Sequence, residues 1–227
     1  MKASAILVAA GSGSRLGSSI PKAFVKLGSH TLLHYCLRAI AQVAGIEEAV
    51  ITAPSGMESM ARAEARSAAL EIPVKITPGG VQRQDSVRIA LALTSAESEC
   101  VVIHDVARPF ATPAMFAESL RHASACGGAI TAIPVADTLK RVAADIISST
   151  IPRLDLYQAQ TPQAFRRDLL IRAHREAIEA GTAATDDADL VERIGGQVRI
   201  VEGSAKNFKI TTQADFELAL ALMEKLA

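Results

Sequence analysis

Short runs of β-branched and other apolar residues alternate with longer Ala- and Leu-rich stretches along the 227-residue chain. The short runs are typical of strands buried on both faces of a parallel sheet, and apolar residues every three or four positions are typical of helices. The alternation therefore predicts an α/β fold in which helices flank a mostly parallel sheet. Strands are expected at 4–8, 49–53, 74–76, 100–104, 129–134 and 198–201, and helices at 31–43, 58–69, 85–93, 113–122, 167–180, 186–194 and 213–226.

One segment, residues 135–153, interrupts this alternation with two β-type runs around a turn at 143–145. It predicts an inserted β-hairpin arm. A two-stranded ribbon alone is marginally stable in water, so this arm is expected to pack against a second copy of the chain. Folding back onto its own domain is the alternative. No linker or repeat divides the rest, and we expect residues 1–227 to form a single domain.

Charge and composition exclude several classes of protein. The 24 Lys and Arg residues balance the 24 Asp and Glu residues without a basic stripe, which argues against a nucleic-acid partner. The three cysteines form no C-x-x-C pair, which favours a reducing compartment, and the cytoplasm is the expected location. No segment approaches the roughly 18 apolar residues that span a bilayer, and cations soon follow the short apolar run 3–10, so neither a membrane partner nor a secretion signal is expected.

A glycine-rich loop, Val8-Ala9-Ala10-Gly11-Ser12-Gly13-Ser14-Arg15, follows the first expected strand, with Lys22 shortly after it. Glycine lets backbone N–H groups approach phosphate oxygens, and the two cations would add charge-assisted contacts. Leu16 stands where a dinucleotide-binding fingerprint needs Gly or Ala, and a Walker Gly-Lys-Ser/Thr sequence is absent. The loop predicts a local site for an anionic ligand of another kind.

Two further motifs follow expected strands. The pair Gly79-Gly80 precedes Asp85 and Ser86, either of which could cap a helix. His104 and Asp105 leave the strand at 100–104 on opposite faces, so only one faces the crevice, and we expect it to be Asp105. Its carboxylate could hold Mg²⁺ or orient a substrate hydroxyl; the alternative is a simple ion pair with Arg108.

Zinc is not expected. His30 and His34 have the spacing of two ligands on one helix, but no third ligand is evident and His30 precedes the helix.

Taken in order, these motifs resemble the 2-C-methyl-D-erythritol 4-phosphate cytidylyltransferase family over nearly the whole chain. The residues that carry the resemblance are Ala9 to Arg15 with Pro21-Lys22, Gly79-Gly80 before Arg83-x-Asp85-Ser86, His104-Asp105-x-Ala107-Arg108-Pro109, Asp137-Thr138-x-Lys140, Gln160-Thr161-Pro162-Gln163, Thr185-Asp186-Asp187 and Phe208-Lys209-Ile210-Thr211. The resemblance implies a Rossmann-like fold, a homodimer clasped by exchanged arms, Mg²⁺ dependence, and transfer of a cytidylyl group from CTP to a sugar-alcohol phosphate in non-mevalonate isoprenoid synthesis.

The resemblance also implies roles for individual residues. Arg15, Lys22 and Lys209 would be catalytic. The nucleotide would be bound by Ala9, Ala10, Gly11, Gly13, Ser14, Gly80, Ser86 and Asp105. The second substrate would be bound by Asp105, Arg108, Thr161 and Thr185, and by Thr138 and Arg153 from the partner's arm.

Val81 and Ala23 depart from the residues common in the family at those positions, and Val81 leaves side-chain contacts to the base open. Two alternatives remain. One is a cytidylyltransferase for ribitol 5-phosphate or a related alditol phosphate, and the other is a nucleotide-binding regulator without turnover. The retained Arg15, Lys22, Asp105 and Lys209 oppose the second alternative.

Overall fold

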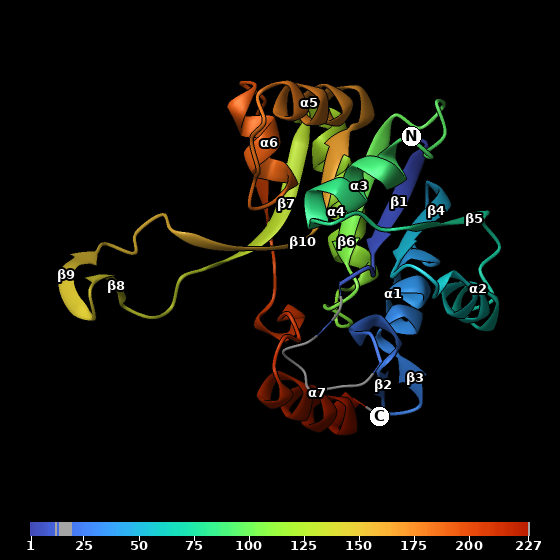
Figure 1. Cartoon of the computed structure of the whole chain (residues 1–227), viewed down its shortest axis with the longest axis horizontal. Coiled ribbons are helices and arrows are strands. Elements are labelled where there is room, and N and C mark those ends of the chain that lie inside the picture. Colours follow the sequence, from blue (N-terminus) through green and yellow to red (C-terminus); the bar gives the residue numbers. More distant parts are fainter. Residues whose placement is uncertain (12, 14–19, 227) are drawn as a thin grey trace.

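The computed structural model describes residues 1–11, 13 and 20–226, and in that part of the chain one seven-stranded sheet forms the centre (Figure 1). Its strand order is β11-β7-β10-β6-β1-β4-β5. The expected strands are all present, as β1 (Ala3–Val8), β4 (Ile46–Ala53), β5 (Val74–Pro78), β6 (Cys100–Asp105), β7 (Gly128–Pro134) and β11 (Val198–Glu202). The pairs β1–β4, β4–β5, β1–β6 and β7–β11 are parallel, which confirms the α/β prediction.

The expected helices are also confirmed, with ends shifted by a few residues. They are α1 (Leu32–Ile40), α2 (Glu58–Ser67), α3 (Arg83–Leu91), α4 (Pro113–Cys126), α5 (Arg167–Glu179), α6 (Asp187–Arg193) and α7 (Gln213–Leu226). Helix α4 shows how sequence sets a boundary, because the Thr112 side chain accepts from Met115 N and Gly127, at φ 105°, ends the helix. Among the described residues, no helix is both long and apolar enough to cross a membrane.

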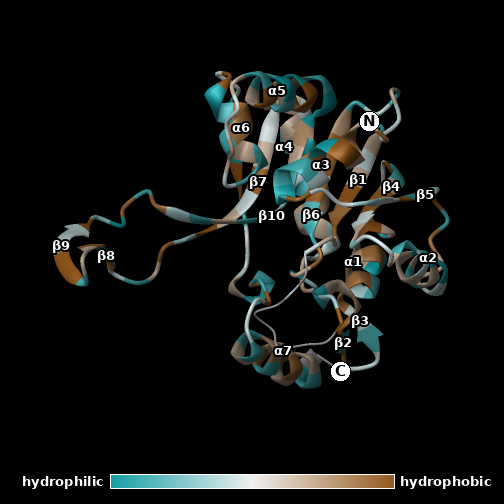
Figure 2. Cartoon of the chain, in the orientation of Figure 1, coloured by the Kyte–Doolittle hydropathy of each residue, from teal (hydrophilic) through white to brown (hydrophobic). Residues whose placement is uncertain are grey.

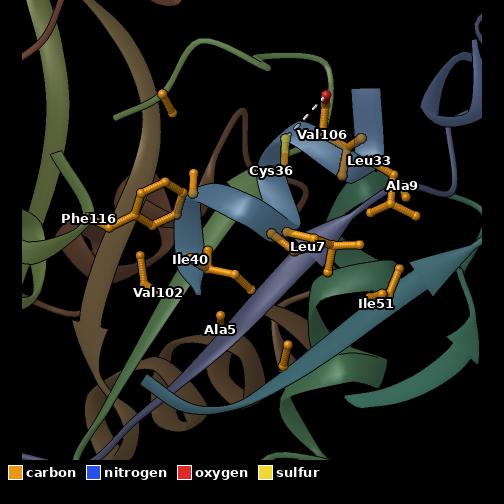
Figure 3. Close-up of a cluster of buried hydrophobic side chains, with 14 of the residues drawn as sticks. Ala5, Leu7, Ala9, Leu33, Cys36, Ile40, Ile51, Val102, Val106 and Phe116 are labelled. Carbon is orange, nitrogen blue, oxygen red and sulfur yellow. Dashed lines mark hydrogen bonds between the residues drawn. The ribbon is translucent and has the colours of Figure 1, made fainter. Parts of the chain in front are cut away.

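Alternating side chains of the central strand β1 build a core on each face of the sheet. Ala5 and Leu7 pack with α1, α2 and α4, whereas Ile6 packs on the other face with α3, α5 and α6. Figure 3 shows the first core, with Phe116 of α4 beside α1 and the Cys36 thiol directed at Val106 O, 3.7 Å away. Both faces of the sheet are thus covered by helices, and β1 and β6 are buried between them.

The strand β10 (Tyr157–Arg166) was not predicted. It lies between β6 and β7 and runs antiparallel to both, so the sheet is mostly parallel, as expected, with β10 as the antiparallel strand. Pro162 argues against a central strand because proline cannot donate to the ladder. The pairing with β7 shifts register between Ala159 and Gln163, so Pro162 falls at an irregularity of the ladder.

The inserted hairpin is present as β8 (Leu139–Ala143) and β9 (Ile146–Ile151), which form a two-stranded sheet of their own. Ala144 and Asp145 have φ of 48° and 63°, the pair of positive values that a tight hairpin turn needs. The hairpin projects away from the body (Figure 1), and Ile146 is 72% exposed. The arm therefore does not fold back onto its own domain.

Smaller elements complete the chain near the site. The short helix η2 (Lys22–Phe24) and the ribbon of β2 (Lys26–Leu27) and β3 (His30–Thr31) precede α1, and η3 (Ala205–Asn207) precedes α7.

Candidate functional site

A cavity of about 270 Å³ opens at the carboxyl ends of β1 and β6. After β1 the chain crosses to β4 on one side, and it later returns as β6 on the other side, so the cavity lies where the strand order reverses. Open α/β sheets bind ligands at such a point. The lining residues include Ala9, Ala10, Gly11, Gly13, Lys22, Gly80, Arg83, Ser86, Asp105, Lys209 and Thr211.

The loop after β1 reaches the cavity through Gly13. This residue has φ +69°, and a Cβ added to it would lie 2.7 Å from Lys22 Cβ, so glycine allows the loop to lie against Lys22. Lys22 Nζ also donates to Ile210 O at 2.7 Å, which joins this loop to the C-terminal segment. Ser14 and Arg15 lie outside the described residues, so their predicted roles stay predictions.

The glycine pair after β5 forms a second wall. Gly80 N donates to Ser86 Oγ at 3.0 Å, and that hydroxyl donates to Gln82 O at 3.2 Å. The predicted capping role holds for Asp85, whose carboxylate accepts from Gln82 N at 3.2 Å at the start of α3. Val81 is 100% exposed and lines the cavity, so position 81 contributes no polar side chain to this wall.

Asp105 is the centre of charge in the cavity. Its Oδ1 accepts from Arg83 Nε at 2.9 Å and its Oδ2 accepts from Lys209 Nζ at 2.6 Å. Burial alone would raise the pKa of Asp105, but Arg83 and then Lys209 outweigh burial and hold this pKa far below its ordinary value. The carboxylate therefore stays ionised. The alternative that Asp105 pairs with Arg108 is wrong, because Arg83 and Lys209 are its partners.

His104 and Asp105 do not bond to each other, as their alternation on β6 predicts. Thr161 Oγ1 accepts from Asp105 N at 3.0 Å and lies 3.0 Å from His104 Nδ1, while His104 Nε2 lies 3.1 Å from Arg108 O. Burial lowers the pKa of His104 to about 4, so the ring is neutral and accepts from Thr161 while it donates to Arg108 O. The Thr161 hydroxyl is thus engaged in holding β6 to β10.

Arg108 lies beside this group without lining the cavity. Its Nη1 donates to Asn207 O at 2.8 Å and its Nη2 to Ala159 O at 3.3 Å. Burial lowers the pKa of Arg108. These contacts orient the guanidinium at the junction of β6, β10 and the C-terminal segment.

Of the predicted substrate residues, Asp105 lines the cavity, and Arg108 and Thr161 lie beside it. The other three lie away from the cavity of their own chain. Thr138 and Arg153 are exposed at the base of the arm, where Arg153 Nη1 donates to Ala136 O. Thr185 is exposed before α6, and its N–H donates to Asp189 Oδ2 at 3.2 Å.

Arg83 and Asp187 are the residues whose importance sequence reasoning missed. Arg83 Nη1 donates to Asp187 Oδ2 at 2.7 Å, so Arg83 bridges two carboxylates 82 positions apart. Both residues stood inside recognised motifs, but no pattern in one sequence signals that α3 and α6 pair through these charges.

Metal binding has one candidate ligand in the cavity. No group of three or more His, Cys, Asp or Glu residues suited to a metal occurs in the described part of the chain, and His30 and His34 stack with ring centroids 4.0 Å apart. Mg²⁺ at nucleotide sites is usually held by one or two carboxylates together with substrate phosphates. Asp105, ionised and facing the cavity, fits that arrangement even though each oxygen already accepts one hydrogen bond.

Comparison with known proteins agrees with this geometry. The family model for IspD, 2-C-methyl-D-erythritol 4-phosphate cytidylyltransferase, matches residues 3–225. The enzyme of that name from Deinococcus radiodurans is 43% identical over 97% of this chain and 89% of its own length, and that from Syntrophotalea carbinolica is 40% identical over 96% and 95%.

Solved structures agree as well. The Thermus thermophilus cytidylyltransferase superimposes with a TM-score of 0.82 at 36% identity, covering 99% of this chain and 100% of its own. The 4-diphosphocytidyl-2C-methyl-D-erythritol synthase from Anaerococcus prevotii gives 0.86 at 28% identity, covering 98% of each chain. On the full-length match of sequence and fold, this chain belongs to the 2-C-methyl-D-erythritol 4-phosphate cytidylyltransferase family.

Proposed function

We propose that this chain transfers the cytidylyl group of CTP to 2-C-methyl-D-erythritol 4-phosphate, giving 4-diphosphocytidyl-2-C-methyl-D-erythritol and pyrophosphate in the non-mevalonate isoprenoid pathway. Family membership makes it a cytidylyltransferase. The observation that carries the assignment of the site is that Lys22 and Lys209, 187 positions apart, line one cavity with glycine-rich walls.

The reaction places two anions against each other. The substrate phosphate is already a nucleophile and needs no strong base, but it must approach a triphosphate whose α-phosphoryl oxygens gain charge during attack. Fixed cations reduce the repulsion and stabilise that charge. In the proposed mechanism Lys22 and Lys209 bind the triphosphate, and Arg15 binds it as well, as the family resemblance implies.

Asp105 prepares Lys209 for this task. The 2.6 Å ion pair holds the ammonium group at the cavity before the nucleotide binds. A cation placed in advance needs little reorganisation during the reaction, which is how preorganised charges accelerate catalysis.

The nucleotide's base and ribose would lie between the loop after β1 and the glycine pair after β5. Ala9 and Ala10 on one side and Gly80 and Ser86 on the other line the same cavity. A Cβ at Gly79 would collide with Ala10 Cβ, so the two walls approach each other closely. Backbone groups at that spacing favour the smaller pyrimidine base.

The second substrate would bind beside Asp105. Arg108 and Thr161 are held next to it by the contacts around His104, and a cation at Arg108 suits an anionic alcohol phosphate. Mg²⁺, where bound by Asp105 and the triphosphate, would neutralise phosphate charge.

The arm supports a homodimer in which arms are exchanged. Val142, Ile146 and Ile147 expose apolar surface on an isolated two-stranded sheet, and Figure 2 shows this apolar segment on β9. Exposed apolar side chains on a marginally stable ribbon favour burial against another copy. Thr138 and Arg153, which lie at the base of the arm, would then reach the second substrate of the partner.

Pyrophosphate release from CTP tests the function. The purified protein is assayed with Mg²⁺ and, in parallel, methylerythritol phosphate, ribitol 5-phosphate or no acceptor. The proposal expects release with methylerythritol phosphate at least about tenfold faster in kcat/KM than with ribitol 5-phosphate. Faster reaction with ribitol 5-phosphate would refute the substrate assignment, and CTP binding without release in any arm would identify a regulator.

A further inference from the structure

A chain of charges leads from the cavity into the interior of the protein. Arg83 donates Nε to Asp105 Oδ1 at 2.9 Å and Nη1 to Asp187 Oδ2 at 2.7 Å. Behind it, His174 Nε2 of α5 lies 3.2 Å from Asp187 Oδ1. Asp187 is only 1% exposed, and neither Asp187 nor His174 is among the described residues that line the cavity.

We propose that Asp187 is a positioning residue for cytidylyl transfer, acting through Arg83 to hold Asp105 and thereby Lys209 in place; the proposal rests on the proposed function. The sequence pointed to Thr185 in this segment, but Thr185 is exposed outside the cavity, whereas Asp187 connects to it through Arg83.

The geometry of the guanidinium carries the argument. The planar guanidinium of Arg83 binds one carboxylate through Nε and another through Nη1. It cannot rotate without breaking one of these two charge-assisted hydrogen bonds. The orientation of Arg83 toward Asp105 is therefore fixed by Asp187, a buried carboxylate that does not line the cavity.

A purely structural role does not explain a buried charge at Asp187, because removing a carboxylate from water costs free energy. Burial alone would raise the pKa of Asp187, but Arg83 and His174 outweigh burial and keep the pKa below its ordinary value, so the side chain is a buried anion. Apolar packing usually stabilises an interior as well as a buried ion pair does. A role in orienting Arg83 accounts for a charge at this position.

Removal of the Asp187 charge changes how Arg83 and Lys209 share the Asp105 carboxylate. Without that charge Arg83 keeps one anionic partner, and the guanidinium can pivot until two of its N–H groups face Asp105. That pivot draws the carboxylate away from Lys209. Displacement of a catalytic group by about 1 Å costs on the order of 10² in rate.

The test measures kcat and both KM values of the full-length enzyme for Asp187→Asn, which keeps the side-chain volume. Asp168→Asn is the matched control, because Asp168 pairs with Arg166 at the other end of β6 from Asp105. Calorimetry with CTP gives the stoichiometry of folded sites. We expect kcat per site to fall about 10- to 100-fold with KM for CTP within about threefold of wild type, and the control to match wild type.

Other results would overturn the inference. A kcat per site within about twofold of wild type refutes it, and so does activity lost only in proportion to CTP-binding sites, which is the mark of a structural role. A wild-type protein that is inactive with every acceptor refutes the proposed function itself, before any variant is compared.

A second pair of variants applies if Asp187→Asn does not fold. His174→Leu removes the donor to Asp187 and should lower kcat per site, whereas His174→Gln restores a donor and should recover it. Equal kcat in both variants refutes the positioning role.

Discussion

Lys209→Ala separates catalysis from stability, because the same side chain contributes very differently to each. In the folded protein Lys209 Nζ pairs with Asp105 Oδ2 at 2.6 Å, and Arg83 Nε remains on the other oxygen at 2.9 Å. The substitution therefore removes one cation from the cavity and leaves Asp105 ionised and paired.

The expected stability cost is small. The Lys209 side chain is 40% exposed, and an ion pair that water reaches contributes no more than about 1 kcal/mol. For a chain of this size that corresponds to a shift in Tm of about 2–4 °C. The catalytic cost is much larger: if Lys209 stabilises charge on the transferred phosphoryl group, its removal should lower kcat about 10²- to 10³-fold, or about 3–4 kcal/mol of barrier.

The assay is steady-state pyrophosphate release with both substrates saturating, next to thermal melts of the same samples. Lys206→Ala is the control, since Lys206 is an exposed lysine of η3 that does not line the cavity. A kcat within about threefold of wild type would refute the placement of Lys209 at the reacting phosphate. A fall in Tm above about 10 °C would refute the small stability contribution expected of the Lys209–Asp105 ion pair, because the pair would then have a structural role.

Four further outcomes are expected. Lys22→Met should lower kcat about 10²-fold or more while melting near wild type, measured in the same release assay. Gly79→Ala should weaken CTP binding by calorimetry and cost about 1–3 kcal/mol of unfolding free energy, since its Cβ would collide with Ala10 and lie 2.9 Å from Ser86 Oγ. Ile147→Asp should yield a monomer by sedimentation that binds CTP normally and has a raised KM for the alcohol phosphate; an active monomer with an unchanged KM would contradict arm exchange. Urea unfolding should show stability falling as pH drops below about 4, because the depressed pKa of Asp105 means that the unfolded chain binds more protons there than the folded one.

The sequence predicts the helices and the parallel strands because their signals are local. Helix α4, for example, begins at a capping threonine and Pro113, and both are visible in the sequence. The strand β10 lacks such a signal, since Pro162 and three glutamines interrupt its apolar residues and its pairing depends on β6 and β7 being already in place. β10 becomes a strand through its tertiary contacts with β6 and β7, so no short stretch of the sequence predicts it.

The candidate site divides in the same way. Glycines and cations that follow strands are recognisable, because carboxyl ends of parallel strands meet at one edge, and Gly13, Lys22 and Asp105 do line one cavity. The pairing of Arg83 with Asp187 needs helices from distant parts of the chain to meet, so it becomes visible only in three dimensions.

Because the His104 imidazole is buried, the charge state at the carboxyl end of β6 does not change near neutral pH. With a pKa near 4 the imidazole carries no charge at neutral pH, and the contacts from its two nitrogens to Thr161 and Arg108 keep the same donors and acceptors there. A substrate phosphate group, in contrast, changes its charge near pH 6. An inflection of the rate between pH 5 and 8 would therefore arise from a group other than His104, and this part of the protein acts as a fixed frame.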